Sequence, residues 1–154
     1  MLKRTYEGQE PCSVARTLEI VGERWTWLIV RDAFLGLTRF AEFQRSLGIA
    51  RNVLADRLGR LVEHGILERV PYSQRPVRYE YRLTEKGRDL FTALNALRQW
   101  GDRYLSERPM RLLVRKSDRT PVVAALVPEG APVLGADEIE LVPGPGFPRD
   151  AGGP

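Results

Sequence analysis

The 154-residue chain has one cysteine, one histidine and no long apolar run, and each shortage excludes a class of protein. A single cysteine, Cys12, cannot form an internal disulfide, which favours a cytoplasmic protein. No run approaches the roughly 18 apolar residues that span a bilayer, so we expect no membrane partner. The N-terminus carries charge but lacks the apolar segment of a secretory signal.

The same shortages argue against catalysis. A nucleophile pair would need Cys12 and His64, which lie far apart in the sequence. The sequence has no Gly-rich phosphate loop and no HExxH-like metal motif. Adjacent carboxylates at Asp137 and Glu138 fall in a predicted loop with nothing nearby to tune them. We therefore predict a protein that is not an enzyme and has no cofactor.

Basic charge is concentrated in the first two thirds of the chain. Residues 1–109 hold 19 Lys and Arg against 14 Asp and Glu, whereas residues 110–154 hold 5 against 6. All basic residues except Lys3, Lys86 and Lys116 are arginine, which can bind phosphate or guanine through two parallel hydrogen bonds. A GC-rich genome would enrich arginine equally, so the charge is consistent with a nucleic-acid partner without establishing one.

Residues 38–63 predict two short helices joined by a tight turn. Phe40, Phe43 and Leu47 form an apolar stripe on the first helix, and Gly48 ends it. The second helix, from about residue 50 to 64, has an apolar stripe of Leu54, Leu58 and Leu61. Its opposite face holds Arg51, Asn52, Asp56, Arg57 and Arg60. This division suits a helix-turn-helix, although any amphipathic surface helix also has a polar face.

The remaining sequence predicts a mixed α+β protein that is mainly α. Helices are expected over residues 13–21 and 23–34, with Thr38 capping the third helix. Alternating runs at 66–72 and 78–83 predict a hairpin with its tip at 73–77, followed by a long helix from Thr84. Beyond Pro109 we expect strands at 110–115 and 121–127, a third at 138–142, and a Pro/Gly-rich tail.

This order of elements is typical of a winged helix-turn-helix with flanking dimerisation helices and a C-terminal β appendage. We assign residues 1–109 to the DNA-binding and dimerisation domain and 110–154 to the appendage. The hairpin would be the wing, and its polar tip could reach DNA beside the recognition helix. Some winged helices bind proteins instead, so a protein-interaction module without sequence-specific DNA binding stays the alternative.

Three longer runs carry a family resemblance. They are C-S-V-A-R-T-L-E-I-V-G-E-R-W-T-W-L-I-V-R-D-A-F-L-G-L-T-R-F-A-E-F, V-L-A-D-R-L-G-R-L-V-E-H-G-I-L-E-R and R-Y-E-Y-R-L-T-E-K-G. Residues 11–105 resemble the HxlR-type transcription regulators, relatives of the MarR group. The resemblance implies a homodimer that binds an inverted-repeat operator, with repression as our working prediction.

The resemblance also implies where the two copies meet and whether metal is bound. The first and last helices of the family build its dimer interface, which corresponds here to Val14, Leu18, Val21, Leu90, Leu94, Leu97, Trp100 and Tyr104. Some members end in a zinc-ribbon-like segment with paired cysteines, echoed here by L-V-P-G-P-G. No cysteine follows Cys12 and no histidine follows His64, so we expect a metal-free remnant.

We predict DNA contacts from three elements. Arg51, Asn52 and Arg57 would reach base edges, because arginine pairs well with guanine and asparagine with adenine. Thr38, Arg39 and Arg60 are assigned to phosphate, although Arg60 could instead pair with Asp56. The other predicted contacts are Ala50, Val53 and Asp56 on the recognition helix and Gln74, Arg75 and Arg78 at the wing. The alternative for Arg51, Asn52 and Arg57 is a solvated helix face.

Cys12 is a candidate redox sensor. Some members of the resembled family use a cysteine just before the first helix to sense quinones, aldehydes or oxidants. A thiol at a helix N-terminus can be unusually reactive, and Arg16 lies one turn further on. The alternative is that Cys12 caps or packs at the domain edge. A small-molecule or electrophile effector at the dimer interface is the corresponding partner prediction.

Overall fold

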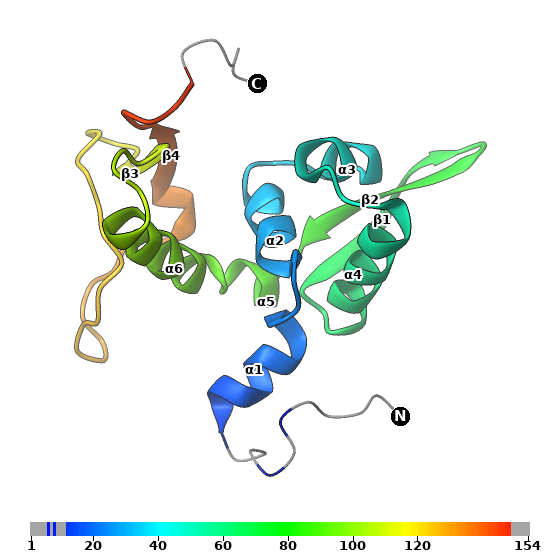
Figure 1. Cartoon of the computed structure of the whole chain (residues 1–154), viewed down its shortest axis with the longest axis horizontal. Coiled ribbons are helices and arrows are strands. Elements are labelled where there is room, and N and C mark those ends of the chain that lie inside the picture. Colours follow the sequence, from blue (N-terminus) through cyan, green and yellow to red (C-terminus); the bar gives the residue numbers. More distant parts are fainter. Residues whose placement is uncertain (1–5, 7, 9–11, 149–154) are drawn as a thin grey trace. The chain divides into compact units, whose positions relative to one another are not determined.

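The chain forms two compact units in a computed structural model, which describes residues 6, 8 and 12–148. The units are Met1–Asp89 and Leu90–Pro154, and each is described by itself. The first contains α1 (Ser13–Val21), α2 (Thr26–Phe34), α3 (Phe40–Leu47), α4 (Arg51–Glu63), β1 (Leu67–Gln74), β2 (Val77–Leu83) and α5 (Glu85–Arg88) (Figure 1). The predicted class, mainly α with a small β component, is confirmed.

The core of the first unit lies where α2, α3 and α4 meet the base of the hairpin (Figure 1). Ile29 from α2, Phe43 from α3, and Leu54 and Leu58 from α4 have no exposed surface. Each large apolar side chain buried in this way stabilises the fold by about 1.5–3 kcal/mol relative to an exposed position. The predicted apolar stripe of α4 therefore fixes one face of that helix in the core.

Helices α3 and α4 and the turn between them form a helix-turn-helix. Gly48 ends α3 in the left-handed region (φ 61°), which a residue without a Cβ adopts easily. The start of α3 differs from the predicted Thr38 cap. The Glu42 carboxylate instead accepts hydrogen bonds from the backbone N–H groups of Thr38 (2.9 Å) and Arg39 (2.8 Å). The Thr38 hydroxyl points to Glu80 on β2 (3.4 Å).

The wing is a longer hairpin than the sequence predicted. β1 and β2 are antiparallel and pair from Leu67 opposite Leu83 to Gln74 opposite Val77, with an irregularity between Pro71 and Ser73. Only residues 75 and 76 remain at the tip, because the polar residues before and after them join the ladder.

Two helix predictions require correction. α2 begins at Thr26 rather than near residue 23, because Trp25 takes a left-handed conformation (φ 78°) that interrupts the helix. The long helix expected from Thr84 is divided: Thr84 caps the short α5, and α6 begins after a turn at residues 89–90. Gly87 lies so close to the Ile66 carbonyl oxygen that a Cβ would overlap it, which explains the glycine in α5.

The second unit contains α6 (Phe91–Tyr104), β3 (Arg111–Arg115), the 3₁₀ helix η1 (Ala136–Glu138) and β4 (Ile139–Pro143). β3 pairs with β4, not mainly with residues 121–127 as predicted. That segment makes one bridge, between Val114 and Pro121. Further along it, the Gln99 amide from α6 bonds the N–H and C=O of Ala124 (3.0 and 3.1 Å), so a side chain replaces a partner strand.

The chain divides into compact units after Asp89, whereas the sequence predicts a boundary between functional regions after residue 109. Residues 90–109 lie in the second compact unit. Their assignment with the DNA-binding and dimerisation domain stays a prediction. No helix within the described ranges is long and apolar enough to cross a membrane.

Candidate nucleic-acid interface

The first turn of α4 presents an open edge to solvent. Ala50, Arg51 and Asn52 are all exposed. The N-terminal residue before the helix, Ala50, provides no side-chain acceptor, and the first turn contains no acidic residue. The backbone N–H groups of this turn are thus open to an anion from outside, which the positive end of the helix dipole favours.

Arginine and aromatic side chains pair on three elements around that edge. The guanidinium of Arg51 lies 5.0 Å from the ring centre of Phe40 on α3. Arg39, just before α3, lies 4.6 Å from the ring centre of Tyr72 on β1. Each aromatic face supports a cation that needs no acidic partner, so the positive charge stays available for an anionic ligand.

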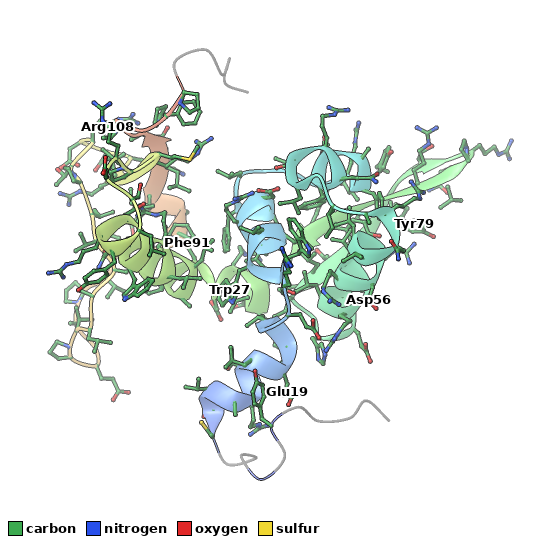
Figure 2. The ribbon with its side chains drawn as sticks, in the orientation of Figure 1. Glu19, Trp27, Asp56, Tyr79, Phe91 and Arg108 are labelled. Atoms are coloured by element: carbon green, nitrogen blue, oxygen red, sulfur yellow. The ribbon has the colours of Figure 1, made fainter. Side chains whose placement is uncertain are left out.

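The hairpin adds a further pair that sequence reasoning missed. The Arg69 guanidinium on β1 lies 4.1 Å from the ring centre of Tyr79 on β2, and Tyr79 is labelled in Figure 2. The pairing of the two strands indicates this contact, because Arg69 lies opposite Tyr81 and Tyr79 is its diagonal neighbour across the strands. At the tip, Gln74, Arg75 and Arg78 are exposed, and Arg75 and Arg78 have no ion-pair partner in the part of the chain that the structure describes.

Three other predicted DNA-binding residues are placed less openly or carry negative charge. Thr38 is half-buried and directed to Glu80. Val53 is half-buried. Asp56 is exposed and projects from α4 (Figure 2), where it forms an ion pair with Arg57.

Arg57 and Arg60 occupy the edge of α4 that meets the connection between α1 and α2. Arg57 Nη2 donates to Glu23 Oε2 (2.9 Å), and Arg60 Nη1 donates to Glu23 Oε1 (3.2 Å). Their side chains are only 17% and 23% exposed. The structure therefore brings both arginines to an exposed carboxylate of the same chain, Glu23, which the sequence did not indicate as their partner.

The Glu42 carboxylate fixes the start of α3, the first helix of the helix-turn-helix. The backbone N–H groups of Arg39 and Thr38 donate to its carboxylate and hold its pKa below the usual value. A carboxylate here also suits the positive end of the α3 dipole. The ionised form fixes the start of α3, and with it Arg39.

An apolar stripe on α6 is exposed. Leu97, Trp100 and Tyr104 share one side of the helix and are 52%, 56% and 61% exposed, with the two aromatic rings 5.5 Å apart. Leu90 and Leu94 are half-buried. A run of large apolar side chains facing water on one helix is typical of a surface that another chain covers.

The candidate interface residues on α1 divide in the same way. Val14 and Leu18 are exposed, whereas Val21 is buried at 1% exposure. Val21 therefore contributes to the core, and its role at the dimer interface stays a prediction.

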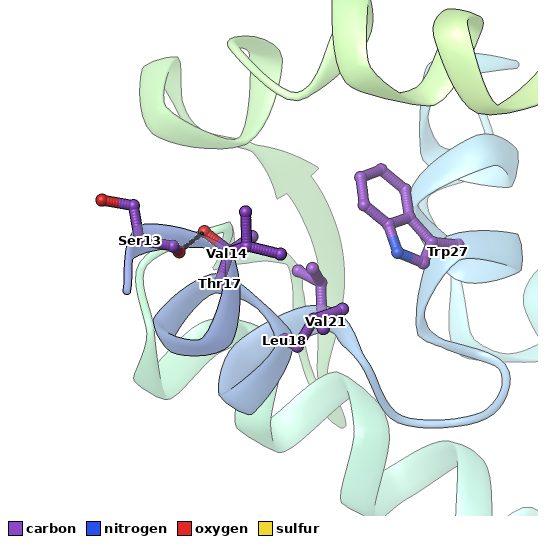
Figure 3. Close-up of a pocket in the computed structure, with 6 residues that line it drawn as sticks. All are labelled: Ser13, Val14, Thr17, Leu18, Val21 and Trp27. Carbon is purple, nitrogen blue, oxygen red and sulfur yellow. Dashed lines mark hydrogen bonds between the residues drawn. The ribbon is translucent and has the colours of Figure 1, made fainter. Parts of the chain in front are cut away.

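A shallow apolar groove runs beside α1. It encloses about 240 Å³ between Ser13, Val14, Thr17, Leu18 and Val21 on α1 and the indole of Trp27 on α2 (Figure 3). Cys12 is exposed at the start of the same helix. Across the described residues, no group of three His, Cys, Asp or Glu side chains is placed to hold a metal ion.

Residues 20–109 match the family model described as an HxlR-like helix-turn-helix. The chain is 58% identical over 104 residues to the uncharacterized HTH-type transcriptional regulator Rv3095 of Mycobacterium tuberculosis. That match covers 68% of this chain and 64% of Rv3095, so it spans less than two thirds of this relative's length.

Two solved structures are similar over different shares of the chain. The crystal structure of PA1607 has 48% identity, covers 84% of this chain and 93% of that chain, and has a TM-score of 0.70. The redox regulator HypR in its reduced form has 34% identity, covers 61% of this chain and 96% of that chain, and has a TM-score of 0.56. In both cases the sequence identity is higher than a shared fold alone requires.

Proposed function

The chain belongs to the HxlR-like helix-turn-helix family, and we propose that it is a transcription regulator that binds an inverted-repeat operator as a homodimer. The observation that carries the proposal is the open first turn of α4, where Arg51 and Asn52 are exposed and stand beside unfilled backbone donors. A regulator of this kind acts in the cytoplasm, with repression as the working prediction.

The proposed interface has three parts. Arg51 and Asn52 on α4 read base edges in the major groove, the function of the first turn of a recognition helix. Arg39 contacts phosphate where the backbone passes α3. The wing contributes Arg75, Arg78 and Gln74, which reach phosphate or the minor groove next to it.

Ala50, Thr38, Val53 and Asp56 have supporting positions in this scheme. Ala50 lets the backbone approach phosphate, and Thr38 and Val53 lie at the rim of the contact. Asp56 is the one acidic residue proposed there, and its pair with Arg57 offsets its repulsion of DNA.

The exposed stripe of α6 supports the homodimer, together with Val14 and Leu18 on α1. Two recognition helices related by a two-fold axis would enter successive major grooves about one helical turn apart, which requires an inverted repeat.

Leu97→Asp tests the homodimer by placing a charge in the stripe. Sedimentation equilibrium should show the wild type as a dimer and this variant as a monomer. Thr92→Asp adds the same charge at another exposed position of α6 and should stay dimeric. A wild-type monomer at micromolar concentration would contradict the homodimer.

The function is tested by binding to the intergenic DNA upstream of the gene, against a shuffled competitor at moderate salt. We expect tight, competitor-resistant binding and a protected inverted repeat in footprinting, and deletion of the gene should raise transcription from that promoter. Equal, weak binding to both DNAs would overturn the proposal and favour a protein-interaction module.

Cys12 is the proposed point of regulation. It is exposed at the start of α1, beside the groove, and HypR is by its name a redox regulator. An oxidant should lower operator affinity in a way that a thiol reductant reverses, and an electrophile should lower it without such reversal. Cys12→Ser should bind DNA normally and respond to neither. An equal response of both proteins would exclude Cys12 as the sensor.

A further inference from the structure

We propose that Arg57 and Arg60 do not contact DNA but clamp α4 to the connection between α1 and α2, with Glu23 as the shared acceptor. In this inference they are positioning residues, and the clamp determines where the recognition helix presents Arg51. The inference rests on the proposed DNA-binding function and changes the assignment that the sequence suggested for both arginines.

Arg57 has acceptors for each of its three donor groups. Nε donates to the carbonyl oxygen of Arg24 (3.2 Å), Nη2 donates to Glu23 (2.9 Å), and Nη1 pairs with Asp56. The side chain is 17% exposed. A phosphate could take this guanidinium only by displacing hydrogen bonds that are already formed to Glu23, which is itself 43% exposed, and to Arg24.

Arg60 repeats the arrangement one turn further along α4. Nη1 donates to the second oxygen of Glu23 (3.2 Å), and Nη2 donates to the carbonyl oxygen of Glu19 (3.2 Å) in the last turn of α1. Its Nε is buried without a partner in the described part of the chain. Figure 2 shows Glu19 on α1, the helix that precedes the connection.

The two oxygens of Glu23 therefore join two positions on one face of the recognition helix. The segment that holds this carboxylate is not helical, and its last residue, Trp25, has a left-handed backbone. Backbone hydrogen bonds join this segment to α1 and α2, and its side-chain links to α4 are the charged hydrogen bonds of Glu23.

α1 also carries the groove and the exposed Cys12. Arg60 bonds α1 directly at Glu19, and Arg57 bonds the connection that follows α1. A shift of α1 that carries this connection along either breaks these bonds or moves α4 with it. The clamp is thus a continuous hydrogen-bonded route from the proposed regulatory helix to the proposed recognition helix, and its two ends have distinct functions.

The experiment measures Glu23→Gln, Arg57→Gln and their double variant in the full-length protein, with Glu63→Gln as control. Glu63 is an exposed carboxylate on α4 with no ion pair among the residues described, so it reports the general effect of removing one negative charge. The readouts are operator affinity, its dependence on salt concentration, and backbone hydrogen exchange without DNA.

We expect Glu23→Gln and Arg57→Gln each to weaken operator binding about 5-fold, and the double variant to be no weaker than either single one. The slope of log affinity against log salt should not change, because no phosphate contact is lost. Amides at residues 22–26 should exchange about 3-fold faster or more in all three variants. Glu63→Gln should neither weaken operator binding nor speed amide exchange at residues 22–26.

A different pattern would overturn the clamp. If Arg57 contacts phosphate, Arg57→Gln lowers the salt slope by about 0.9, while Glu23→Gln frees the arginine and tightens binding. Additive losses in the double variant would also contradict the inference. If the wild type prefers no DNA, the proposed function fails, and hydrogen exchange still decides whether the clamp exists.

Discussion

The two edges of α4 use the same residue type in opposite ways. Arg51, in the first turn, is exposed and lies against an aromatic ring. Arg57 and Arg60 point to Glu23 and are mostly covered. A guanidinium that faces solvent can bind a new partner at little cost, whereas one already bonded to protein acceptors must first lose those bonds. A basic residue on a recognition helix therefore cannot be assigned to DNA from its position in the sequence alone.

The two edges of α4 can differ only if its apolar face is fixed in the core. Leu58→Ala tests this packing and has the largest expected effect, a loss of stability. Leu58 has no exposed surface, so the truncation should lower the free energy of unfolding by about 2–5 kcal/mol in urea denaturation. The fully exposed Leu126 is the matched control, since Leu126→Ala should change stability by less than about 0.5 kcal/mol. A loss below about 1 kcal/mol at Leu58 would mean that α4 is not anchored as described.

Arg51→Ala tests the open edge. Discrimination between the operator and a base-substituted operator should fall by about 1–3 kcal/mol if Arg51 reads a base, with little change in stability. Competition binding measures it, and Arg108→Ala removes an exposed arginine outside the first unit as the control. Equal losses on operator and random DNA would assign Arg51 to the DNA backbone.

Glu42→Gln tests whether the start of α3 holds Arg39 in place for the same edge. The variant should lose about 1 kcal/mol of stability at pH 7, as other helix N-terminal acceptors do. The pKa of Glu42 is lowered in the folded protein, so its contribution is present above the unfolded value, 4.5, and is lost as pH falls through the folded value. The gap between wild type and Glu42→Gln should therefore narrow in acid. A gap that widens in acid would contradict this role.

Arg75→Ala tests whether the exposed arginines of the wing contact phosphate, and its expected effect is smaller than those above. One lost phosphate contact should lower the salt slope of binding by about 0.9 and weaken operator and random DNA alike. Filter binding over a salt series measures this. An unchanged slope would place the wing tip away from DNA.

Most of the fold could be predicted because it follows from local patterns. The apolar stripes of α3 and α4, the glycine between them and the alternating strands each depend on neighbours a few residues away. The predictions failed where a distant or unusual contact decides. Trp25 shortens α2 with a left-handed backbone, and the Gln99 side chain occupies the backbone groups of Ala124 that a strand would use.

The candidate site divides along the same line. Exposure of Arg51, Asn52 and the wing arginines could be predicted from the polar face of a helix and the tip of a hairpin. The contacts of Arg57 and Arg60 could not, since Glu23 lies 34 and 37 residues away and belongs to a turn that the sequence assigned to a helix. Pattern identifies a face, and only the folded chain shows which part of that face is already occupied.

Arginine-selective labelling distinguishes the two edges of α4 in one experiment on the wild-type protein, with and without operator DNA, when each arginine is followed by mass spectrometry. We expect Arg51 to react quickly in the free protein and to be protected by DNA. Arg57 and Arg60 should react slowly in both states. Rapid reaction of Arg57 and Arg60 in the free protein, followed by protection on DNA, would contradict the account and assign both edges of α4 to DNA.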